Sequence, residues 1–383
     1  MPTERPEPGQ PLPAWVRRLL AGLFVVIAVA VISGALWLAM NTARRETSAI
    51  RLHWQAGEPR QLNVDCFPWL APDAETFVCE REGALWLGTL NAGATTRLDV
   101  RFPEGVEHVH QVEWLPNGEA FVVLFATPTP RTDDEQAAPW PVFHVALNDA
   151  TPTPLPDAVP GASLQRLPTG VAYPAREALV VWDGQHLRTI PTGQNATVYP
   201  HVVDIIQIAP TETLTPTRLA RLVVGQSGAV LRVMTLEEGR RDERQVDMRL
   251  YRGERIFAWS PSGAWLAYAN REERLRTPAL WVTTVDGQTR YQLWKADEQG
   301  KIDFLHWLDE GTLFFAFVPD GARPSERTRF FLVDATRSAG TVEALWQGGH
   351  TPTLARDGRT LVFARGAAPN ETYWLVHFTP VGE

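Results

Sequence analysis

The sequence predicts an all-β protein, a β-propeller of seven blades that follows one N-terminal transmembrane helix. Three observations lead to this fold class. Short apolar segments alternate with tight turns along most of the chain, and the 31 Pro and 28 Gly fall mainly between those segments. The best-formed turns recur at a nearly constant spacing, which is typical of repeat architectures. A single uncharged apolar stretch precedes the first of them.

The apolar stretch runs from Leu19 to Met40, LLAGLFVVIAVAVISGALWLAM. A helix of this length spans about 33 Å, enough for the hydrocarbon core of a bilayer. The alternative is a secretory signal peptide cleaved after Ala35, but the run is longer than the usual signal-peptide core. We therefore expect a disordered cytoplasmic tail at 1–16 and an uncleaved anchor helix at 17–42.

Small residues lie four positions apart in the anchor, at Ala30 and Gly34 and again at Ala35 and Ala39. Such spacing lets two helix backbones approach closely in a membrane. We expect this helix to pack against another membrane protein, the alternative being a helix that only tethers the main domain.

The two cysteines indicate which side of the membrane the main domain occupies. Cys66 and Cys79 flank FPWLAPDAETFV, which we interpret as one hairpin that brings the two sulfur atoms to adjacent strands. A disulfide requires an oxidising compartment, whereas two buried thiols are the alternative. Two arginines lie on each side of the apolar stretch, at 17–18 and 44–45, so the positive-inside rule hardly favours either orientation. We predict a disulfide, a cytoplasmic N-terminus and a periplasmic or extracellular main domain.

The repeating unit is clearest in FAWSPSGAWLAY, where a turn ending in Gly263 separates two apolar strands. Comparable turns end at Gly118, Gly311 and Gly358, and Ala74 takes the glycine position in another. Glycine at the end of such a turn adopts positive φ without strain. The segments ALWLGTL, PVFHVAL, ALWVTTVDG, RFFLVDA and TYWLVHF follow as third strands.

The spacing of these turns sets the number of blades. The turns at 263, 311 and 358 lie 48 and 47 residues apart, so the 284 residues from 74 to 358 hold about six periods and seven turns. Segments 173–190 and 201–236 are assigned to the weaker third and fourth blades. Six or eight blades are the alternative counts. The strand within 50–64 has no blade of its own, and we expect it to complete the last blade and close the propeller domain of 50–383.

Residues 257–287 are similar to the bacterial WD-type propeller repeat of TolB C-terminal domains. Trp259-Ser260-Pro261-Ser262-Gly263 matches its Trp-Ser-Pro-Asp-Gly turn apart from one Ser for Asp, and Leu280-Trp281-Val282 matches its later strand. The third and fourth blades barely carry the pattern. The resemblance implies four-stranded blades around a central channel, and binding or scaffold roles far more often than catalysis.

Catalytic motifs are missing from the sequence. It contains no Cys-x-x-Cys-His, no phosphate-binding loop, no Gly-x-Gly-x-x-Gly and no His-Glu-x-x-His. Gly225-Gln226-Ser227-Gly228-Ala229 is the nearest approach to a nucleophile elbow, and we interpret it as a turn. We expect no enzyme activity and no cofactor, and the net charge of −8 argues against a nucleic-acid partner.

One set of polar residues recurs four positions before the end of the innermost strands, and His108 lies two residues before the first of them. Side chains at equivalent heights could converge on the channel as a ligand or metal site, since His and Asp are suitable ligands. The alternative is a solvated polar channel. The candidates are His108, His110, Arg255, Asp303 and His350.

Two Thr/Pro-rich segments, 127–141 and 151–161, are interpreted as surface loops that bind a partner or are disordered. Together these features predict a single-pass membrane protein whose propeller is a protein-binding scaffold or an accessory subunit of a membrane complex. Its partners would be the lipid bilayer and one or more proteins. The alternative function is a ligand or metal sensor, or an enzyme, that uses the channel.

Overall fold

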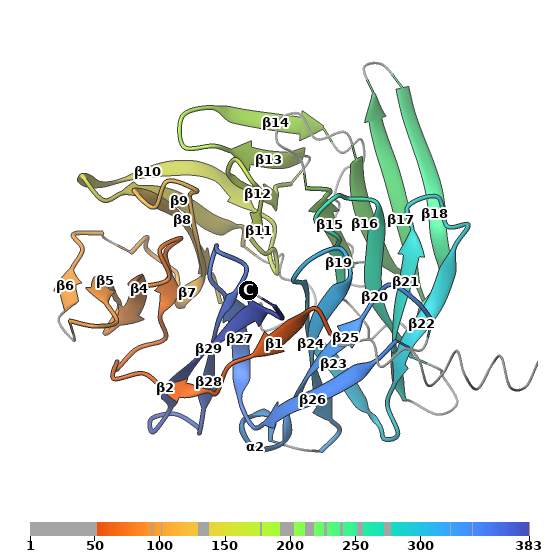
Figure 1. Ribbon diagram of the computed structural model, residues 1–383. Coiled ribbons are helices and arrows are strands. Elements are labelled where there is room, and N and C mark those ends of the chain that lie inside the picture. The colour runs from red at the N-terminus through yellow and green to blue at the C-terminus, as the bar shows by residue number, and fades with distance from the viewer. Residues whose placement is uncertain are drawn as a thin grey trace, which may run out of the picture. The chain divides into compact units, whose positions relative to one another are not determined.

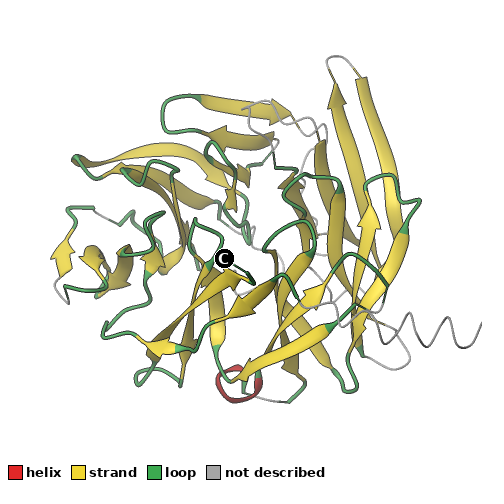
Figure 2. Ribbon diagram, in the orientation of Figure 1, coloured by secondary structure: helices red, strands yellow, loops and turns green. Residues whose placement is uncertain are grey.

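The computed structural model describes residues 52–92, 95–100, 102–128, 138–176, 178–191, 203–210, 218–225, 228–237, 240–250, 256–271, 277–321, 323–338 and 340–382. These residues form seven antiparallel sheets that follow one another around a ring (Figure 1). Strands dominate, with one short helix, α2 (Pro324–Arg327), in the described part (Figure 2). The all-β propeller of seven blades is thus confirmed.

The predicted tail and anchor helix, Ala30, Gly34, Ala35, Ala39 and Arg255 lie outside the described residues. Among the residues that are described, no helix is long and apolar enough to cross a membrane.

Each blade has its strands in chain order from the centre of the ring outward, and blade seven takes its outer strands from the start of the described chain. Blade one has β3 (Trp69–Leu70), β4 (Thr76–Arg81), β5 (Ala84–Thr89) and β6 (Thr95–Arg97); blade two has β7 (His108–Trp114), β8 (Ala120–Ala126), β9 (Trp140–Ala146) and β10 (Asp149–Ala158). Blade three has β11 (Gln165–Arg166), β12 (Val171–Pro174), β13 (Ala178–Trp182) and β14 (Leu187–Pro191); blade four has β15 (Val203–Ile208), β16 (Arg218–Gly225), β17 (Gly228–Glu237) and β18 (Arg240–Leu250). Blade five has β19 (Phe257–Trp259), β20 (Trp265–Arg271), β21 (Pro278–Thr284) and β22 (Arg290–Lys295); blade six has β23 (Gly300–Trp307), β24 (Thr312–Pro319), β25 (Arg329–Asp334) and β26 (Val342–Gln347). Blade seven has β27 (His350–Leu354), β28 (Thr360–Arg365) and β29 (Thr372–Pro380), completed by β1 (Trp54–Ala56) and β2 (Arg60–Gln61).

The ring is closed by the first strands of the described chain. β1 pairs antiparallel with β29, with Trp54 opposite Pro380, and β2 pairs with the same strand further along. Leu52 and Trp54 are buried in a cluster with side chains of blades six and seven. Blade seven therefore takes its outer strands from residues 54–61, within the segment 50–64 that was predicted to complete it.

The turn that joins the two innermost strands has the same geometry in several blades. In blade five the Gly263 N–H donates to the Ser260 carbonyl at 2.9 Å, and Gly263 has φ +68°. Gly118 and Gly358 have φ values of +70° and +68°, and Ala74 takes φ +56° at the same place. The positive φ explains why glycine ends these three turns. Gly311 of blade six does not adopt a positive φ, contrary to expectation, and its N–H donates to Asp309 Oδ1 at 2.8 Å. We call the side of the ring that carries these turns the inner-turn face.

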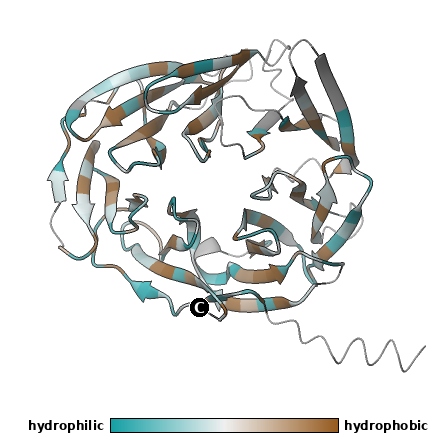
Figure 3. Ribbon diagram, turned by 45° about the horizontal axis from the view of Figure 1, so that its top comes forward, coloured by the Kyte–Doolittle hydropathy of each residue, from teal (hydrophilic) through white to brown (hydrophobic). Residues whose placement is uncertain are grey.

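Apolar side chains fill the spaces between neighbouring blades. One cluster joins Val78 and Leu85 of blade one to Trp114 and Phe121 of blade two. Figure 3 shows hydrophobic residues on strands around the ring. Each blade buries both of its faces against neighbours, which is why its middle strands are almost continuously apolar.

Two assignments from the sequence need correction. Segment 173–190 covers only the three outer strands of blade three, because its innermost strand is the two-residue β11. Residues 151–158, interpreted as part of a loop, belong to β10, the outermost strand of blade two. A strand rich in proline is tolerated there because an outermost strand needs hydrogen bonds on one side only.

Candidate functional site at the centre of the ring

The innermost strands of blades two, five and six all end in tryptophan, and each indole bonds the preceding blade. Trp114 Nε1–H donates to the carbonyl of Trp69 at 2.9 Å. The other two pairs repeat this contact, Trp259 to Gln207 at 3.3 Å and Trp307 to Ala258 at 3.1 Å. The tryptophan of the repeat thus does more than fill the core: it fixes the distance between neighbouring innermost strands.

Glutamine side chains join consecutive innermost strands in the opposite direction. Gln111 of blade two donates from Nε2 to the Leu164 carbonyl at 2.9 Å and accepts the Leu164 N–H at 2.8 Å. Gln165 makes the same pair of bonds to Ile208 of blade four. Gln207 then donates to the carbonyl of Phe257 in blade five at 3.0 Å. The amide side chain reproduces a peptide group, so it extends backbone pairing from blade to blade.

Blade three differs, because its innermost strand ends in Arg166 where three other blades have tryptophan. Arg166 Nε donates to Glu113 Oε1 at 2.7 Å, and Nη2 reaches Glu113 Oε2 at 3.3 Å. Glu113 is only 6% exposed. Arg166 also donates to the carbonyls of Leu354 (2.8 Å) and Ala355 in blade seven.

Arg356 of the blade-seven inner turn makes the reciprocal connection. Its Nη1 donates to the Trp114 carbonyl at 2.7 Å and lies 3.5 Å from Glu113 Oε1. Its Nη2 donates to the carbonyls of Leu167 and, at 3.3 Å, Gly170 in blade three. Blades seven and three are not adjacent in the ring, so these side chains must meet on its inner side. We call Glu113, Arg166 and Arg356 the central cluster.

His306 borders this cluster from blade six. Burial lowers its pKa to about 3, and the nearby Arg166 charge adds to the shift. The imidazole is therefore neutral at physiological pH. Burial also lowers the pKa of Arg356, to about 10, against the opposing effect of Glu113, so this guanidinium stays protonated.

The donors of the central cluster are directed at protein acceptors. Arg166 bonds Glu113 and two carbonyls of blade seven, and Arg356 bonds carbonyls of blades two and three. Hydrogen bonds from a charged donor in a site of low dielectric are among the stronger ones in proteins. The arrangement is suited to holding blades two, three and seven together rather than to receiving a ligand.

The predicted channel residues contact their own blades. The His110 ring packs on Trp140 of blade two, with centroids 4.6 Å apart, and burial together with His108 lowers the pKa of His110. Asp303 pairs with Lys301 of its own strand at 2.6 Å.

His350 Nε2 lies 3.2 Å from the Gly366 carbonyl and 3.6 Å from Glu371 Oε1, both in blade seven. No group of three potential metal ligands forms anywhere in the described ranges. The structure does not bring the candidates His108, His110, Asp303 and His350 together as a metal site.

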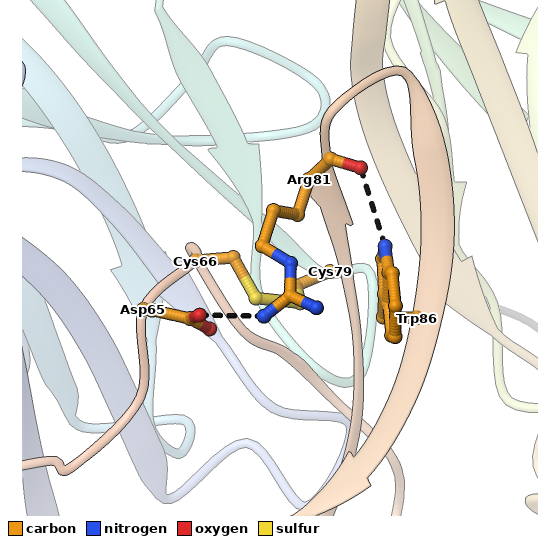
Figure 4. Close-up of a disulfide and its surroundings, with 5 residues drawn as sticks. All are labelled: Asp65, Cys66, Cys79, Arg81 and Trp86. Carbon is orange, nitrogen blue, oxygen red and sulfur yellow. Dashed lines mark hydrogen bonds and ion pairs between the residues drawn. A yellow bond between two sulfur atoms is a disulfide. The ribbon is translucent and has the colours of Figure 1, made fainter. Parts of the chain in front are cut away.

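The two cysteines meet at the seam between blades seven and one. Cys66 precedes β3, Cys79 lies in β4, and a disulfide joins them with Cα atoms 5.8 Å apart (Figure 4). Both are buried, among side chains that include Ala355 and Val362 of blade seven. Beside them Arg81 pairs with Asp65 at 2.5 Å and stacks on Trp86 at 4.0 Å.

Sequence reasoning missed the central cluster, although one signal was present. Glu113 and His306 both directly precede the tryptophan that ends their strand, a position that faces the neighbouring blade. A charged or titratable residue at such a repeated, buried position needs a partner. Arg166 carried no comparable signal, because its strand is two residues long and lacks the tryptophan.

Comparisons with known proteins support the fold. No protein-family model and no curated protein sequence matches this chain. A chain of the mitotic checkpoint complex is similar in structure, with 11% identity, a TM-score of 0.50, and coverage of 84% of this chain and 94% of that one. Hydrazine synthase from Kuenenia stuttgartiensis is similar with 14% identity, a TM-score of 0.51, and coverage of 81% and 96%.

An oligogalacturonate lyase from Vibrio parahaemolyticus is also similar, at 12% identity and a TM-score of 0.44, with coverage of 80% of this chain and 76% of that chain. The likeness to the mitotic checkpoint chain and to hydrazine synthase, at 11% and 14% identity, shows the fold and nothing further.

Proposed function

We propose that this protein is a membrane-anchored, extracytoplasmic propeller that acts as a protein-binding scaffold or an accessory subunit of a membrane complex. The observation that carries the proposal is that the polar groups at the ring's centre bond other parts of the ring. Arg166 and Arg356 both pair with Glu113 and bond backbone carbonyls of blades two, three and seven, so they stabilise the ring. A rigid closed ring leaves its loops and outer surfaces for partners.

Sequence features supply the rest of the proposal. The uncharged stretch from Leu19 to Met40 supports an anchor, and the Cys66–Cys79 pair supports an oxidising compartment. The TolB-like repeat of 257–287 supports a binding role, as the resemblance implies. The small residues around Gly34 support a partner within the membrane.

The test is quantitative co-purification from native membranes in mild detergent, followed by mass spectrometry. Three forms are compared: the full chain, a form whose residues 17–42 are replaced by an unrelated transmembrane helix, and the Gly34→Leu variant. If the propeller is the scaffold, the same proteins co-purify with all three forms in equal ratio. Partners lost from both altered forms would assign the association to the helix. A full chain that extracts from membranes with no stoichiometric partner would overturn the proposal.

A further inference from the structure

The start of the innermost strand of blade seven has an unusual backbone. Thr351, in β27, has φ +52°, in the left-handed region that a β-branched residue rarely adopts. The pairing of β27 with β28 shifts register between His350 and Thr353, as at a β-bulge. Bulges and strained residues gather at functional sites, where they re-aim a side chain. Thr351 is exposed, so its side chain is open to solvent.

The hydroxyl of Thr351 is bonded to the neighbouring imidazole. Thr351 Oγ1 lies 3.0 Å from His350 Nδ1, and His350 Nε2 lies 3.2 Å from the Gly366 carbonyl. Because a carbonyl oxygen can only accept, Nε2 carries the proton of the neutral imidazole, and Nδ1 accepts the hydrogen bond of the Thr351 hydroxyl. The ring is thus in the tautomer that acts as a base toward Thr351.

A carboxylate lies on the other side of the same imidazole. Glu371 Oε1 is 3.6 Å from His350 Nε2, and the histidine and glutamate side chains are 22% and 29% exposed. Burial raises the pKa of Tyr373, and the charge of Glu371 adds to the shift, so the Tyr373 hydroxyl stays protonated and donates to Glu371. A negative charge at this distance stabilises the imidazolium that forms when Nδ1 takes a proton.

A second threonine–histidine contact in blade seven differs in where the hydroxyl proton goes. Thr360 Oγ1 lies 3.0 Å from His377 Nδ1, but the same hydroxyl donates to Asp357 Oδ2 at 2.6 Å. Thr360 is also only 2% exposed. This hydroxyl is therefore held in a buried structural contact, and the pair provides an internal comparison for Thr351 and His350.

We propose that Thr351, His350 and Glu371 form a hydrolytic site for carboxylic esters. Thr351 is the nucleophile, His350 is the general base, and Glu371 is a positioning residue that acts through His350. A hydroxyl bonded to a base, which a third group orients, is the arrangement that activates hydroxyl nucleophiles. Because the Thr351 side chain is open to solvent, the substrates are esters whose leaving group departs readily, such as phenol esters. This activity goes beyond the scaffold function and does not depend on it.

The reaction has two steps, and both use the same base. Thr351 Oγ1 attacks the ester carbonyl carbon while His350 Nδ1 takes the hydroxyl proton; the bond to the phenol oxygen then breaks, and Nδ1 returns the proton to that oxygen. In the second step Nδ1 takes a proton from water, which attacks the acyl group on Thr351. The bond from the acyl carbon to Oγ1 breaks, the hydroxyl regains its proton, and a carboxylic acid leaves.

Hydrolysis of p-nitrophenyl acetate by the full chain in detergent micelles tests this site. The wild type should release p-nitrophenol in a burst and then more slowly, because an acyl intermediate accumulates. Mass spectrometry of the protein quenched during the reaction should find one acetyl group, and peptide mapping should place it on Thr351. This measurement uses the wild type alone, so it does not depend on the folding of any variant.

Variants of the three residues give distinct results. Thr351→Val keeps the β-branched shape without the hydroxyl and should abolish both the burst and the acetyl group, whereas Thr351→Ser should retain both. His350→Gln should lower kcat about a hundredfold. Glu371→Gln should lower kcat about tenfold and leave KM unchanged, because it acts only on the charge that forms during the reaction.

His377→Gln is the matched control. It removes an exposed histidine of the same blade that lies equally close to a threonine hydroxyl, and it should leave the rate unchanged. Equal melting temperatures show that a lost activity is not unfolding. Three results would each overturn the proposal: a wild type no faster than Thr351→Val, an acetyl group found only on other residues, or a Thr351→Ser variant as inactive as Thr351→Val.

Discussion

At the residue scale, Arg356 joins blade seven to blades two and three, and we expect it to be a main determinant of stability. Its guanidinium donates to the Trp114 and Gly170 carbonyls and lies close to Glu113. Arg356→Met would remove the donor to the Trp114 carbonyl and the positive charge beside the buried Glu113, and should lower the free energy of unfolding by about 3 kcal/mol. Urea denaturation followed by tryptophan fluorescence measures this loss.

Arg359 of the same turn provides the matched control. It is exposed, and its guanidinium lies over the Trp54 ring at 5.2 Å. Arg359→Met should cost under about 1 kcal/mol. Equal losses for the two variants would contradict a special role for Arg356.

His306 predicts how stability depends on pH. Its folded pKa, about 3, lies below the ordinary value of 6.5, so the unfolded chain binds the proton more readily. The contribution of neutral His306 to the free energy of unfolding is fully present above pH 6.5. It is lost as the pH falls toward 3, by at most about 1.4 kcal/mol per pH unit. His306→Gln should reduce the change in melting temperature between pH 6.5 and pH 3. If the melting temperature of the variant changes with pH as steeply as that of the wild type, the acid sensitivity comes from other residues.

The sequence predicts single residues best where a repeat defines their position. Gly118, Gly263, Gly358 and the tryptophan before Ser260 follow from the repeat, and the structure shows the positive φ of these glycines and the indole hydrogen bond. The ion pair between Arg166 and Glu113 cannot be predicted in this way, since it joins residues 53 positions apart that meet only when blades two and three pack together.

At the scale of elements, β1 closes the ring and should contribute strongly to stability. Trp54 is 6% exposed, packs between blades six and seven, and donates to Asp309 Oδ2 at 2.7 Å. Trp54→Ala should cost about 3–5 kcal/mol. The neighbouring Gln55 is exposed, so Gln55→Ala should change the unfolding free energy by less than about 1 kcal/mol. Similar losses of unfolding free energy for both variants would mean that β1 contributes little to stability.

The disulfide should act at the same seam. Cys66 lies in the segment that leads from blade seven to blade one, and Cys79 lies in the second strand of blade one, 13 residues on. We expect mass mapping without reduction to find the pair bonded in protein from its native membrane. Replacing both residues by serine should lower the unfolding free energy by about 3 kcal/mol. Free thiols in native protein would disprove the disulfide.

β10 shows where composition misleads at the scale of elements. Thr-Pro-Thr-Pro-Leu-Pro is typical of a loop, yet Thr153, Pro154 and Leu155 pair with β9 in register. The strand forms because its neighbour supplies the pairing and only Leu155 of these three is buried. The local sequence of β10 does not show that β9 is available to pair with it, because that pairing depends on the tertiary structure.

At the scale of the whole molecule, the regular spacing of the turns predicts the ring and its seven blades. The period holds from blade five to blade seven, whose turns lie 48 and 47 residues apart in the sequence. It fades in blades three and four, because β11 has two residues and the sequence between β15 and β16 contains no glycine. The number of blades could still be predicted from the 284 residues between the turns at 74 and 358, since a closed ring needs whole blades.

The predicted topology would place the whole propeller in a single compartment. An anchor at 17–42 with a cytoplasmic tail would put the propeller on the other side of the membrane, where Cys66 and Cys79 can form a disulfide. A membrane-impermeant amine reagent applied to intact cells should therefore label Lys301, which is exposed in the ring, while a lysine tag added at the N-terminus should react only after lysis.

Both sites should react equally once the membrane is dissolved, which controls for the accessibility of each. Labelling of Lys301 only after lysis would place the propeller in the cytoplasm and remove the basis for the disulfide as well. Release of a soluble propeller that lacks the tag would show instead that the apolar stretch is cleaved as a signal peptide. The scaffold would then have to find its membrane partner through the ring alone.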